Sequence, residues 1–449
     1  MRLARPARRP STTVLAVIFV ALTLLAALAW STGDSNGQRH IDNVEKRVDV
    51  DAKRGEPLTD FTSCLTTCTS WHRKSPDALP SVSCPQGNEP WCEHFYTPEA
   101  ISEACTLLCR NQFPADCAQA KFLVVIGDMG FGYGAELHNR MLTFTYALVV
   151  NRVLVFSRYQ SGWTGQRRPG DDVECQQGNP QDCYYEPITH CALPSTWQRN
   201  TANIFVFPRS RNHSLYDNIT SQFAPFKYLS VSPYHSRMTP TLRLGDPRFP
   251  IPTKHLRQAT TEYWYGIMAR FLFRPKAWLR AQYLVPKALE TFAGPFPRRF
   301  ASVFIRKGDK AMETALVATQ AYFDRVSREC ADLRIEHVYV SSDSKTAVDD
   351  FVGLCARQAP GINVYAMRQN RTDAGFSYEL LQEYLAGRAG DARDLVNVAV
   401  ADAFIMQHAT VWVGTLSSNQ CRFHNELRCG SGRYGRPYIS LDSGKWSFG

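Results

Sequence analysis

Short apolar runs alternate with longer amphipathic runs over the last third of the chain. The apolar runs are rich in valine, isoleucine and aromatic residues, as buried strands are, and the longer runs have a helical period. The predicted strands are Val303–Ile305, Val338–Val340, Asn363–Tyr365 and Val411–Val413, and the predicted helices are Thr319–Glu329, Thr346–Gln358, Asp391–Gln407 and one beginning near Gln420. Repeated strand–helix units predict a mostly parallel, doubly wound sheet.

The same alternation begins upstream at Phe122. The residues FLVVI predict a buried strand, and a glycine-rich turn follows it. After the turn, the predicted elements are a helix, Ala135–Val150, and two strands, Val153–Phe156 and Ile204–Phe207.

An aromatic-rich stretch, Thr260–Ala293, connects these two regions. Its period is helical, and we expect it to break at Pro275 and Pro286. Gly294–Pro297 predicts a hinge. We therefore expect an α/β fold with two lobes, residues 121–295 and 296–449.

The N-terminal 60 residues differ from the rest. Val14–Trp30 carries no charge, so it predicts a membrane-spanning signal anchor, with residues 1–13 as a cytosolic tail and 31–60 as a polar stem. A cleaved signal peptide is the alternative. The flanking charges are Arg2, Arg5, Arg8 and Arg9 before the apolar run and Asp34 after it. Because positive charge stays cytosolic, the rest of the chain is predicted to be luminal or extracellular.

Cysteine usage agrees with that compartment. The chain has 14 cysteines, an even number that suits disulfide formation. Residues 61–120 form a predicted cysteine-rich module that contains Cys64, Cys68, Cys84, Cys92, Cys105, Cys109 and Cys117. Cys64/Cys68 and Cys105/Cys109 have helical i,i+4 spacing, which favours two helices joined by two disulfides, with zinc binding as the alternative.

One cysteine of these seven must pair elsewhere or remain free. Cys175, Cys183 and Cys191 are its candidate partners, and Cys421–Cys429 is a further predicted pair. Three sequons, at Asn212, Asn218 and Asn370, predict N-glycosylation.

The net charge of +10 is spread along the chain without a dense lysine block. No zinc-finger or aromatic RNA-binding motif accompanies it. This favours an anionic ligand or a generally basic surface over a nucleic-acid partner.

The most informative charges follow the strand Val303–Ile305. Arg306 offers a planar fork of donors to a phosphate, Lys307 and Lys310 add point charges, and Asp309 can orient these cations or accept a proton. The alternative is a solvated turn after a strand.

The glycine-rich turn Gly127–Gly134 follows a strand, as in dinucleotide-binding proteins. The next strand, however, ends in Ser157 and Arg158, with no acid to hold a ribose, so a dinucleotide site is not expected. The turn, with Gly132, Tyr133 and Gly134 at its end, can still bring free amides close to a ligand at a helix start, or serve only as a tight turn. His138 faces the same cleft or is structural.

Three strand ends should meet at one edge of the second sheet. They are Arg306–Lys310, Ser341–Asp343 and Gly414–Asn419. Arg306 and the Ser417–Ser418 helix start suit a diphosphate, and Asp402 or Asp343 could accept the two donors of guanine. The sequence therefore predicts a nucleoside-diphosphate pocket in which cationic side chains substitute for a metal.

Four collinear blocks resemble the α1,6-fucosyltransferases that modify the core of N-glycans (glycosyltransferase family 23). The blocks are GFGYGAELHNR, VFIRKGDK, VYVSSD and ADAFIMQHATVWVGTLSSNQCR, and they lie between Phe122 and Arg422. The resemblance implies a two-lobed GT-B fold, whose second, Rossmann-like lobe binds GDP-fucose, and a metal-independent inverting transfer to an N-glycan or glycoprotein.

The resemblance also implies individual roles. Arg306 would bind the β-phosphate with help from Ser418, and Asp402 would contact guanine. Asp309 and Lys310 match the Asp-Lys pair of the family motif. Glu313 would be the catalytic base, although it follows the lysine by three residues where the family has four, and Asp309 is the alternative.

Other positions depart from the family. Phe304 replaces a histidine, Lys307 replaces an arginine, and Ser344 replaces the second acid after Asp343. We expect a single-pass type II Golgi membrane protein that acts as a fucosyltransferase. The alternatives are a protein O-fucosyl or α1,2 type, or a non-catalytic luminal glycan-binding protein. The sequence leaves the oligomeric state open.

Overall fold

The computed structural model describes residues 98–125, 133–156, 184–194, 196–197, 201–206, 225–231, 261–307, 315–368, 392–430 and 438–442. All of them belong to one unit of the chain, Thr59–Gly449. The predicted tail, anchor, stem and sequons lie outside these residues. Within them, no helix has the length and apolar character needed to cross a membrane.

The first sheet is parallel and has the strand order β2-β1-β4-β3. Its strands are β1 (Phe122–Val125), β2 (Val153–Phe156), β3 (Ile204–Val206) and β4 (Tyr228–Val231), and α5 (Tyr133–Val149) connects the first two. The predictions for β1, β2 and β3 are confirmed. β4 was not predicted, because it is four residues long and a polar residue, Ser230, interrupts its apolar run.

The second sheet is also parallel, with the order β7-β6-β5-β8-β9. Its strands are β5 (Ala301–Ile305), β6 (His337–Ser342), β7 (Asn363–Tyr365), β8 (Val411–Gly414) and β9 (Ile439–Ser440), and its helices are α12 (Thr319–Leu333), α13 (Lys345–Gln358), α15 (Ala392–Met406) and α16 (Asn419–Gly430). Every predicted element in this region is present, and β9 is additional.

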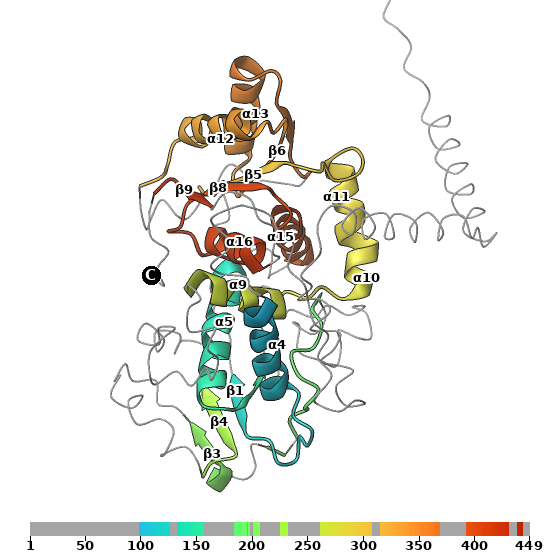
Figure 1. Ribbon diagram of the computed structural model, residues 1–449, viewed down its shortest axis with the longest axis vertical. Helices are drawn as coiled ribbons and strands as arrows, with labels where there is room; N and C mark the ends of the chain where they lie inside the picture. The colour runs from blue at the N-terminus through green and yellow to red at the C-terminus, as the bar shows by residue number, and fades with distance from the viewer. Residues whose placement is uncertain are drawn as a thin grey trace, which may run out of the picture. The chain divides into compact units, whose positions relative to one another are not determined.

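Alternate residues of the central strand β5 enter two different hydrophobic clusters. Val303 and Ile305 pack with α12 and α13 on one face of the sheet, whereas Phe304 joins α15 and α16 on the other. Buried side chains on both faces explain why the strands are continuously apolar. The doubly wound prediction is therefore confirmed for this sheet (Figure 1).

Four helical segments connect the sheets: α9 (Thr261–Leu272), α10 (Ala277–Leu279), the π-helical turn η6 (Arg280–Leu284) and α11 (Val285–Thr291). The helix ends before Pro275, as predicted. The predicted break at Pro286 is wrong, because η6 precedes this proline without interrupting the helical chain. Proline has no N–H to donate, and a wider turn is one way for a helix to accommodate the missing bond.

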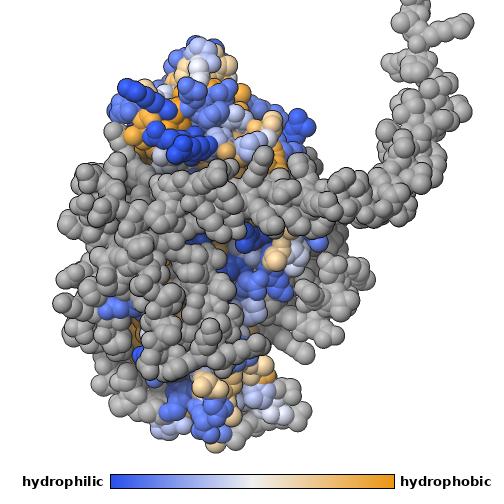
Figure 2. Space-filling view, turned by 45° about the vertical axis from the view of Figure 1, so that its right-hand side comes forward, coloured by the Kyte–Doolittle hydropathy of each residue, from blue (hydrophilic) through white to orange (hydrophobic). Residues whose placement is uncertain are grey.

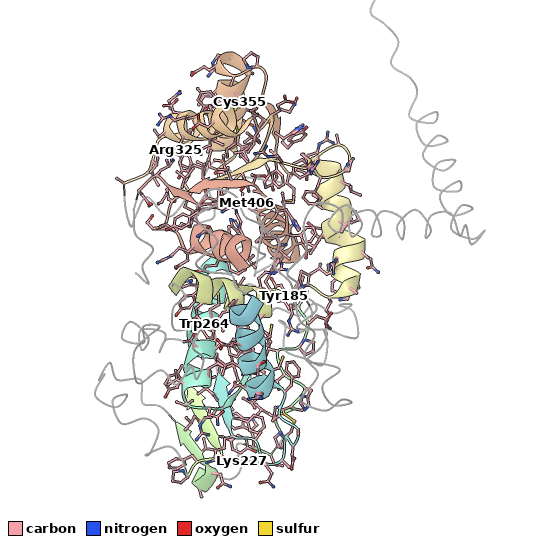
Figure 3. The ribbon with its side chains drawn as sticks, viewed as in Figure 1. Tyr185, Lys227, Trp264, Arg325, Cys355 and Met406 are labelled. Atoms are coloured by element: carbon pink, nitrogen blue, oxygen red, sulfur yellow. A yellow bond between two sulfur atoms is a disulfide. The ribbon has the colours of Figure 1, made fainter. Side chains whose placement is uncertain are left out.

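Helix α16 follows strand β8 of the second sheet. It packs against α5 of the first sheet region and against the connecting helix α9, so it joins the two regions (Figure 1). The rings of Phe423 on α16 and Phe273 lie 5.8 Å apart. Trp264 of α9 is buried (Figure 3). It donates from Nε1 to Thr145 Oγ1 of α5 at 3.2 Å. One hydrophobic cluster thus runs across the predicted boundary at residue 295, and the two-lobe division stays a prediction.

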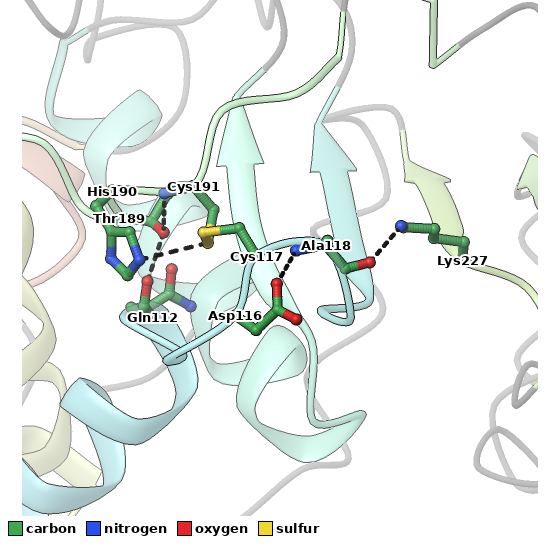
Figure 4. The surroundings of a disulfide bond; sticks show 8 residues. All are labelled: Gln112, Asp116, Cys117, Ala118, Thr189, His190, Cys191 and Lys227. Atoms are coloured by element: carbon green, nitrogen blue, oxygen red, sulfur yellow. Dashed lines mark hydrogen bonds between the residues drawn. A yellow bond between two sulfur atoms is a disulfide. The ribbon is translucent and has the colours of Figure 1, made fainter. Parts of the chain in front are cut away.

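The cysteines of α4 (Pro98–Gln112) confirm part of the disulfide prediction. Cys105 and Cys109 are both buried and both disulfide-bonded, while Cys64 and Cys68 lie outside the described residues. Cys117 bonds to Cys191, one of the three predicted partners (Figure 4).

The same disulfide argues against a zinc site at this position. Cys117, His190 and Cys191 have metal-ligand proximity, but the two sulfur atoms are bonded to each other. Zinc needs thiolates, so this pair cannot serve as its ligands.

The predicted Cys421–Cys429 pair is wrong, since Cys421 is a buried free thiol. Both residues lie on α16. Eight residues of α-helix separate two Cα atoms by about 12 Å, well beyond the ~7 Å that a disulfide allows.

The exposed surface of the described residues shows few large apolar side chains. Leu316 and Val352 are the exposed large hydrophobic residues in this part of the chain. Figure 2 shows hydrophilic and hydrophobic residues intermixed over the end of the molecule formed by α12 and α13.

Candidate functional site

Arg306 is the first charged residue after strand β5, and Asp343 holds its guanidinium. The two side chains form an ion pair in which Asp343 is buried and Arg306 is 18% exposed. The other carboxylate oxygen of Asp343 accepts the Lys307 backbone N–H at 2.8 Å. The predicted phosphate-binding arginine is thus held at the carboxyl edge of the sheet by a buried carboxylate.

Asp343 is held in turn by the way strand β6 becomes helix α13. Ser342 Oγ donates to the Ile305 carbonyl at 2.6 Å and accepts the Ser344 N–H at 3.0 Å. Ser344 is the N-cap of α13, where its hydroxyl accepts the Ala347 N–H at 3.3 Å. A serine suits this cap position well, which gives a structural reason for the departure from the family's acid pair.

The Lys307 side chain points to the segment before α12. Its ammonium donates to the Val317 carbonyl at 2.7 Å. Burial lowers the pKa of Lys307, and the charge of Asp350 partly opposes that effect. Lys307 therefore holds a loop in this structure, and its predicted role as a phosphate contact stays a prediction.

Asp402 lies on α15 and faces the underside of β6. It is buried, and its two carboxylate oxygens accept hydroxyl groups from Tyr339 and, at 2.8 Å, from Ser341. A guanine base would have to share these acceptors. Contact between Asp402 and guanine remains a prediction.

The loop between β8 and α16 carries the predicted phosphate-binding serines. Ser418 is buried and caps α16, with its hydroxyl 3.5 Å from the Cys421 N–H. The Ser417 N–H instead donates to Asp442 Oδ2 at 3.3 Å. Within the described part of the chain, the N–H groups of Asn419 and Gln420 have no hydrogen-bond acceptor. They are the amides at a helix start that suit an anion.

Strand pairing brings the end of β5, and with it Arg306, toward the loop before this helix, because β5 lies next to β8 from Ala301–Val411 to Val303–Val413. Burial raises the pKa of the Cys421 thiol, and the positive charge of Arg306 acts in the opposite direction. Burial likewise raises the pKa of Tyr322, while hydrogen bonding from the Thr415 side chain and the Arg306 backbone opposes the rise. The ends of β5 and β8 and the start of α16 therefore form one site.

Gly134 brings the start of α5 to the same site. A Cβ atom on Gly134 would lie 2.5 Å from Cα and 2.6 Å from the backbone nitrogen of Gln420. Only glycine allows this approach of α5 to the first turn of α16. Tyr133 begins α5. Gly134 therefore serves packing against the site, while donor contact by the residues of the glycine turn stays a prediction.

His138 lies one helical turn beyond Gly134 and is buried between helices. Its Nδ1 is 3.3 Å from Oε1 of the buried Glu426 on α16, and its ring stacks on Tyr265 of α9 with centroids 5.9 Å apart. Nearby, burial lowers the pKa of His424 to about 3, so this second imidazole is neutral. The structure supports the structural alternative for His138.

Four predicted site residues lie outside the described residues. They are Gly132, Asp309, Lys310 and Glu313. Both candidate bases are among them, so their assignment stays a prediction.

Sequence reasoning missed Asp442, which contacts the predicted phosphate loop. Its carboxylate accepts the Leu416 N–H at 2.9 Å and the Ser440 hydroxyl at 2.8 Å, in addition to the Ser417 N–H. Burial alone would raise the pKa of Asp442, but the hydrogen bonds from Ser417, Ser440 and the Leu416 amide outweigh it and lower the pKa. The sequence offered little signal for it, because the strand before it, β9, has only two residues, Ile439 and Ser440.

Comparison with known proteins gives similarity at the level of the fold. No family model and no curated protein matches the sequence. A solved structure of a point mutant of Arabidopsis thaliana FUT1 in complex with GDP has a TM-score of 0.46 and 12% identity, over 86% of this chain and 80% of that one.

Two further solved structures are similar over most of their length. POFUT1 in complex with GDP-fucose has a TM-score of 0.39 and 12% identity, over 72% of this chain and 97% of that one. NodZ α1,6-fucosyltransferase, soaked with GDP-fucose, has a TM-score of 0.37 and 14% identity, over 69% and 93%. Similarity at this level does not establish a shared function.

Proposed function

We propose that this protein transfers fucose from GDP-fucose to a glycan acceptor. The observation that carries the proposal is the pairing of an oriented arginine with an open helix start. Asp343 fixes Arg306 at the end of β5, and the neighbouring strand β8 leads into α16, whose first two amides, Asn419 and Gln420, have no acceptor in the described part of the chain. A guanidinium and a helix N-terminus are together suited to a diphosphate.

The proposed reaction is a single inverting displacement. The acceptor oxygen forms a bond to the anomeric carbon of fucose while the bond from that carbon to the diphosphate oxygen breaks. The acceptor proton goes to a carboxylate, Glu313 or Asp309. Charge develops on the departing diphosphate, so Arg306 and the helix start stabilise the transition state more than the ground state.

The same cationic arrangement would make a divalent metal unnecessary. A metal in nucleotide-sugar enzymes neutralises the diphosphate as it leaves. Here a permanently charged guanidinium and two backbone dipoles would supply that neutralisation.

The finer assignments rest on the four sequence blocks. They favour an N-glycan as acceptor and α1,6 linkage to its core GlcNAc, on a two-lobed GT-B fold. The apolar N-terminal run favours a type II membrane protein. The Cys117–Cys191 disulfide and the disulfide-bonded cysteines of α4 favour a catalytic part in the lumen of the Golgi.

The test is transfer by the full-length protein and its Arg306→Ala variant, supplied with GDP-fucose and an array of glycan and glycopeptide acceptors. Arg357→Ala, on the exposed end of α13, removes the same charge away from the site and is the matched control. We expect Arg306→Ala to lose about 10²–10³-fold in kcat, and the control to keep its activity.

Three outcomes would contradict the proposal. Transfer by Arg306→Ala at the rate of the unmodified protein would remove the phosphate assignment. Binding of GDP without transfer to any acceptor would favour the non-catalytic glycan-binding alternative. Equal thermal stabilisation by GDP, UDP and ADP would remove the guanine assignment.

A further inference from the structure

Asp442 lies where the edge strand β9 ends beside the site. β9 pairs with the end of β8, at Val413–Ile439 and Gly414–Ser440, and the Leu441 N–H donates to the Gly414 carbonyl at 2.9 Å. This pairing places the Asp442 carboxylate against the loop that leads into α16. Four donors then converge on it: the Leu416 and Ser417 amides and the Ser417 and Ser440 hydroxyls.

We propose that Asp442 is a positioning residue for the diphosphate-binding loop, Thr415–Ser418. This inference rests on the proposed function. By accepting the Leu416 and Ser417 amides, the carboxylate fixes the loop that leads into the first turn of α16, where the Asn419 and Gln420 amides have no acceptor in the described part of the chain. Asp442 itself does not contact the diphosphate.

The loop is fixed at both of its ends, which makes the position of its middle depend on Asp442. At the first end, a Cβ atom on Gly414 would collide with the Trp412 ring, so the backbone passes directly over that ring. At the other end, Ser418 caps α16 and its N–H donates to the Thr415 carbonyl at 3.2 Å. Between them, the Ser417 amide donates to Asp442, and the Leu416 amide donates to Asp442 and, at 3.1 Å, to Ser440 Oγ, which itself donates to Asp442.

The negative charge of Asp442 is compatible with a nearby anion because four donors already share it. Charge-assisted hydrogen bonds of this kind are short and strong relative to neutral ones. The alternative is that Asp442 occupies the anion site and that a diphosphate must displace it. The two interpretations predict opposite effects when the charge is removed.

The test compares Asp442→Asn with Asp349→Asn in the full-length protein. Asp349 pairs with Lys345 on the exposed face of α13, so its variant removes an equal charge away from the loop. Asparagine keeps the size of Asp442. One of the two acceptor oxygens becomes an NH₂ donor, however, so the side chain can no longer accept both the Leu416 and Ser417 amides in the same way.

The first measurement needs no ligand. Hydrogen exchange of the Leu416 and Ser417 amides should be slow in the unmodified protein and at least about tenfold faster in Asp442→Asn. Unchanged exchange would overturn the clamp. Asp349→Asn should leave these amides protected.

The second measurement is the affinity for GDP and for inorganic pyrophosphate. Loss of charge-assisted bonds typically changes an equilibrium about tenfold or more, so we expect the Kd of both ligands to rise by that factor in Asp442→Asn. In steady state the loss should fall on KM for GDP-fucose more than on kcat, and Asp442→Glu should recover part of it. Unchanged or tighter binding would overturn the inference, and tighter binding would favour displacement.

Failure of the proposed function gives a different result. If the unmodified protein binds pyrophosphate with no preference for GDP, the fucosyltransferase proposal fails and the positioning role stands. If it binds neither ligand, both fail.

Discussion

Replacing Gly134 with alanine would place a methyl group against the backbone of α16. The added Cβ would lie 2.5 Å from Cα and 2.6 Å from N of Gln420, whereas ordinary carbon contacts are about 3.5–4 Å. These are backbone atoms at the first turn of a buried helix, so they cannot rotate away. The φ angle of Gly134 lies outside the left-handed region, so the effect would be steric and not conformational.

The expected magnitude is the balance of two terms. Alanine in place of glycine in a helix contributes up to about 1 kcal/mol of stability. Overpacking a close contact costs about 1–3 kcal/mol, and the short distances here favour the upper end. We expect a net loss of about 2 kcal/mol in the free energy of unfolding.

The matched control is Gly353→Ala on α13. Its Cβ would lie 3.1 Å from Nη1 of Arg357, the mobile tip of a side chain that can move. This variant should therefore gain up to about 1 kcal/mol. Denaturant unfolding of the two variants should move in opposite directions, with a difference of about 3 kcal/mol.

The same substitution tests the site, because α16 begins beside Arg306. If the first turn of α16 shifts, the affinity for GDP should fall in Gly134→Ala and remain in Gly353→Ala. Equal stability and equal GDP affinity in the two variants would refute the reasoning from packing.

Four further outcomes follow from the structure. Asp343→Asn should weaken GDP binding about tenfold or more, because Arg306 loses the charge that orients it, and a titration unchanged from the unmodified protein would contradict this. The stability difference between the unmodified protein and Asp442→Asn should be constant above the ordinary pKa of 3.8 and should shrink as the pH falls below it, because the folded-state pKa is lowered; a difference that grew in acid would have the wrong sign. Removing the disulfide in Cys117→Ser/Cys191→Ser should cost about 4 kcal/mol, given its sequence separation of 74, as measured by unfolding; an unshifted transition would exclude a stabilising role. Fucose transfer should persist in EDTA, and a strict requirement for a divalent cation would contradict the cation-for-metal interpretation.

The sequence was sufficient for the central strands of the second sheet, β5, β6 and β8, because these strands are buried on both faces. Val303, Phe304 and Ile305 form a short apolar run of β-prone residues, and the run ends at the charged residue Arg306. Periodicity therefore located both the strand and its functional end. β9 has two residues and no such pattern, so neither the strand nor the role of Asp442 could be predicted from it.

Partners that are distant in sequence explain the remaining differences. The sequence predicts that the Asp402 carboxylate can bind guanine, because its own helix offers it no evident partner. Its acceptors are used by Tyr339 and Ser341, more than sixty residues earlier, and their proximity depends on how α15 packs beneath β6. Likewise, Gly134 suggested a backbone approaching a ligand, when the approaching group is α16. In both cases the residue type indicated a special role, but the sequence did not reveal which group the residue contacts.

The position of α16 has a consequence for how a donor could bind. Its first turn carries the proposed diphosphate amides, while its body is buried against α5 and α9 through His138, Glu426 and Phe423. Separating His138 and Glu426 would break a close polar contact between two buried side chains, which costs free energy. A motion that opened the site by moving α16 away from α5 would have to overcome that cost. We therefore expect a donor to enter at the carboxyl edge of the second sheet while α16 stays in place, because this route avoids that free-energy cost.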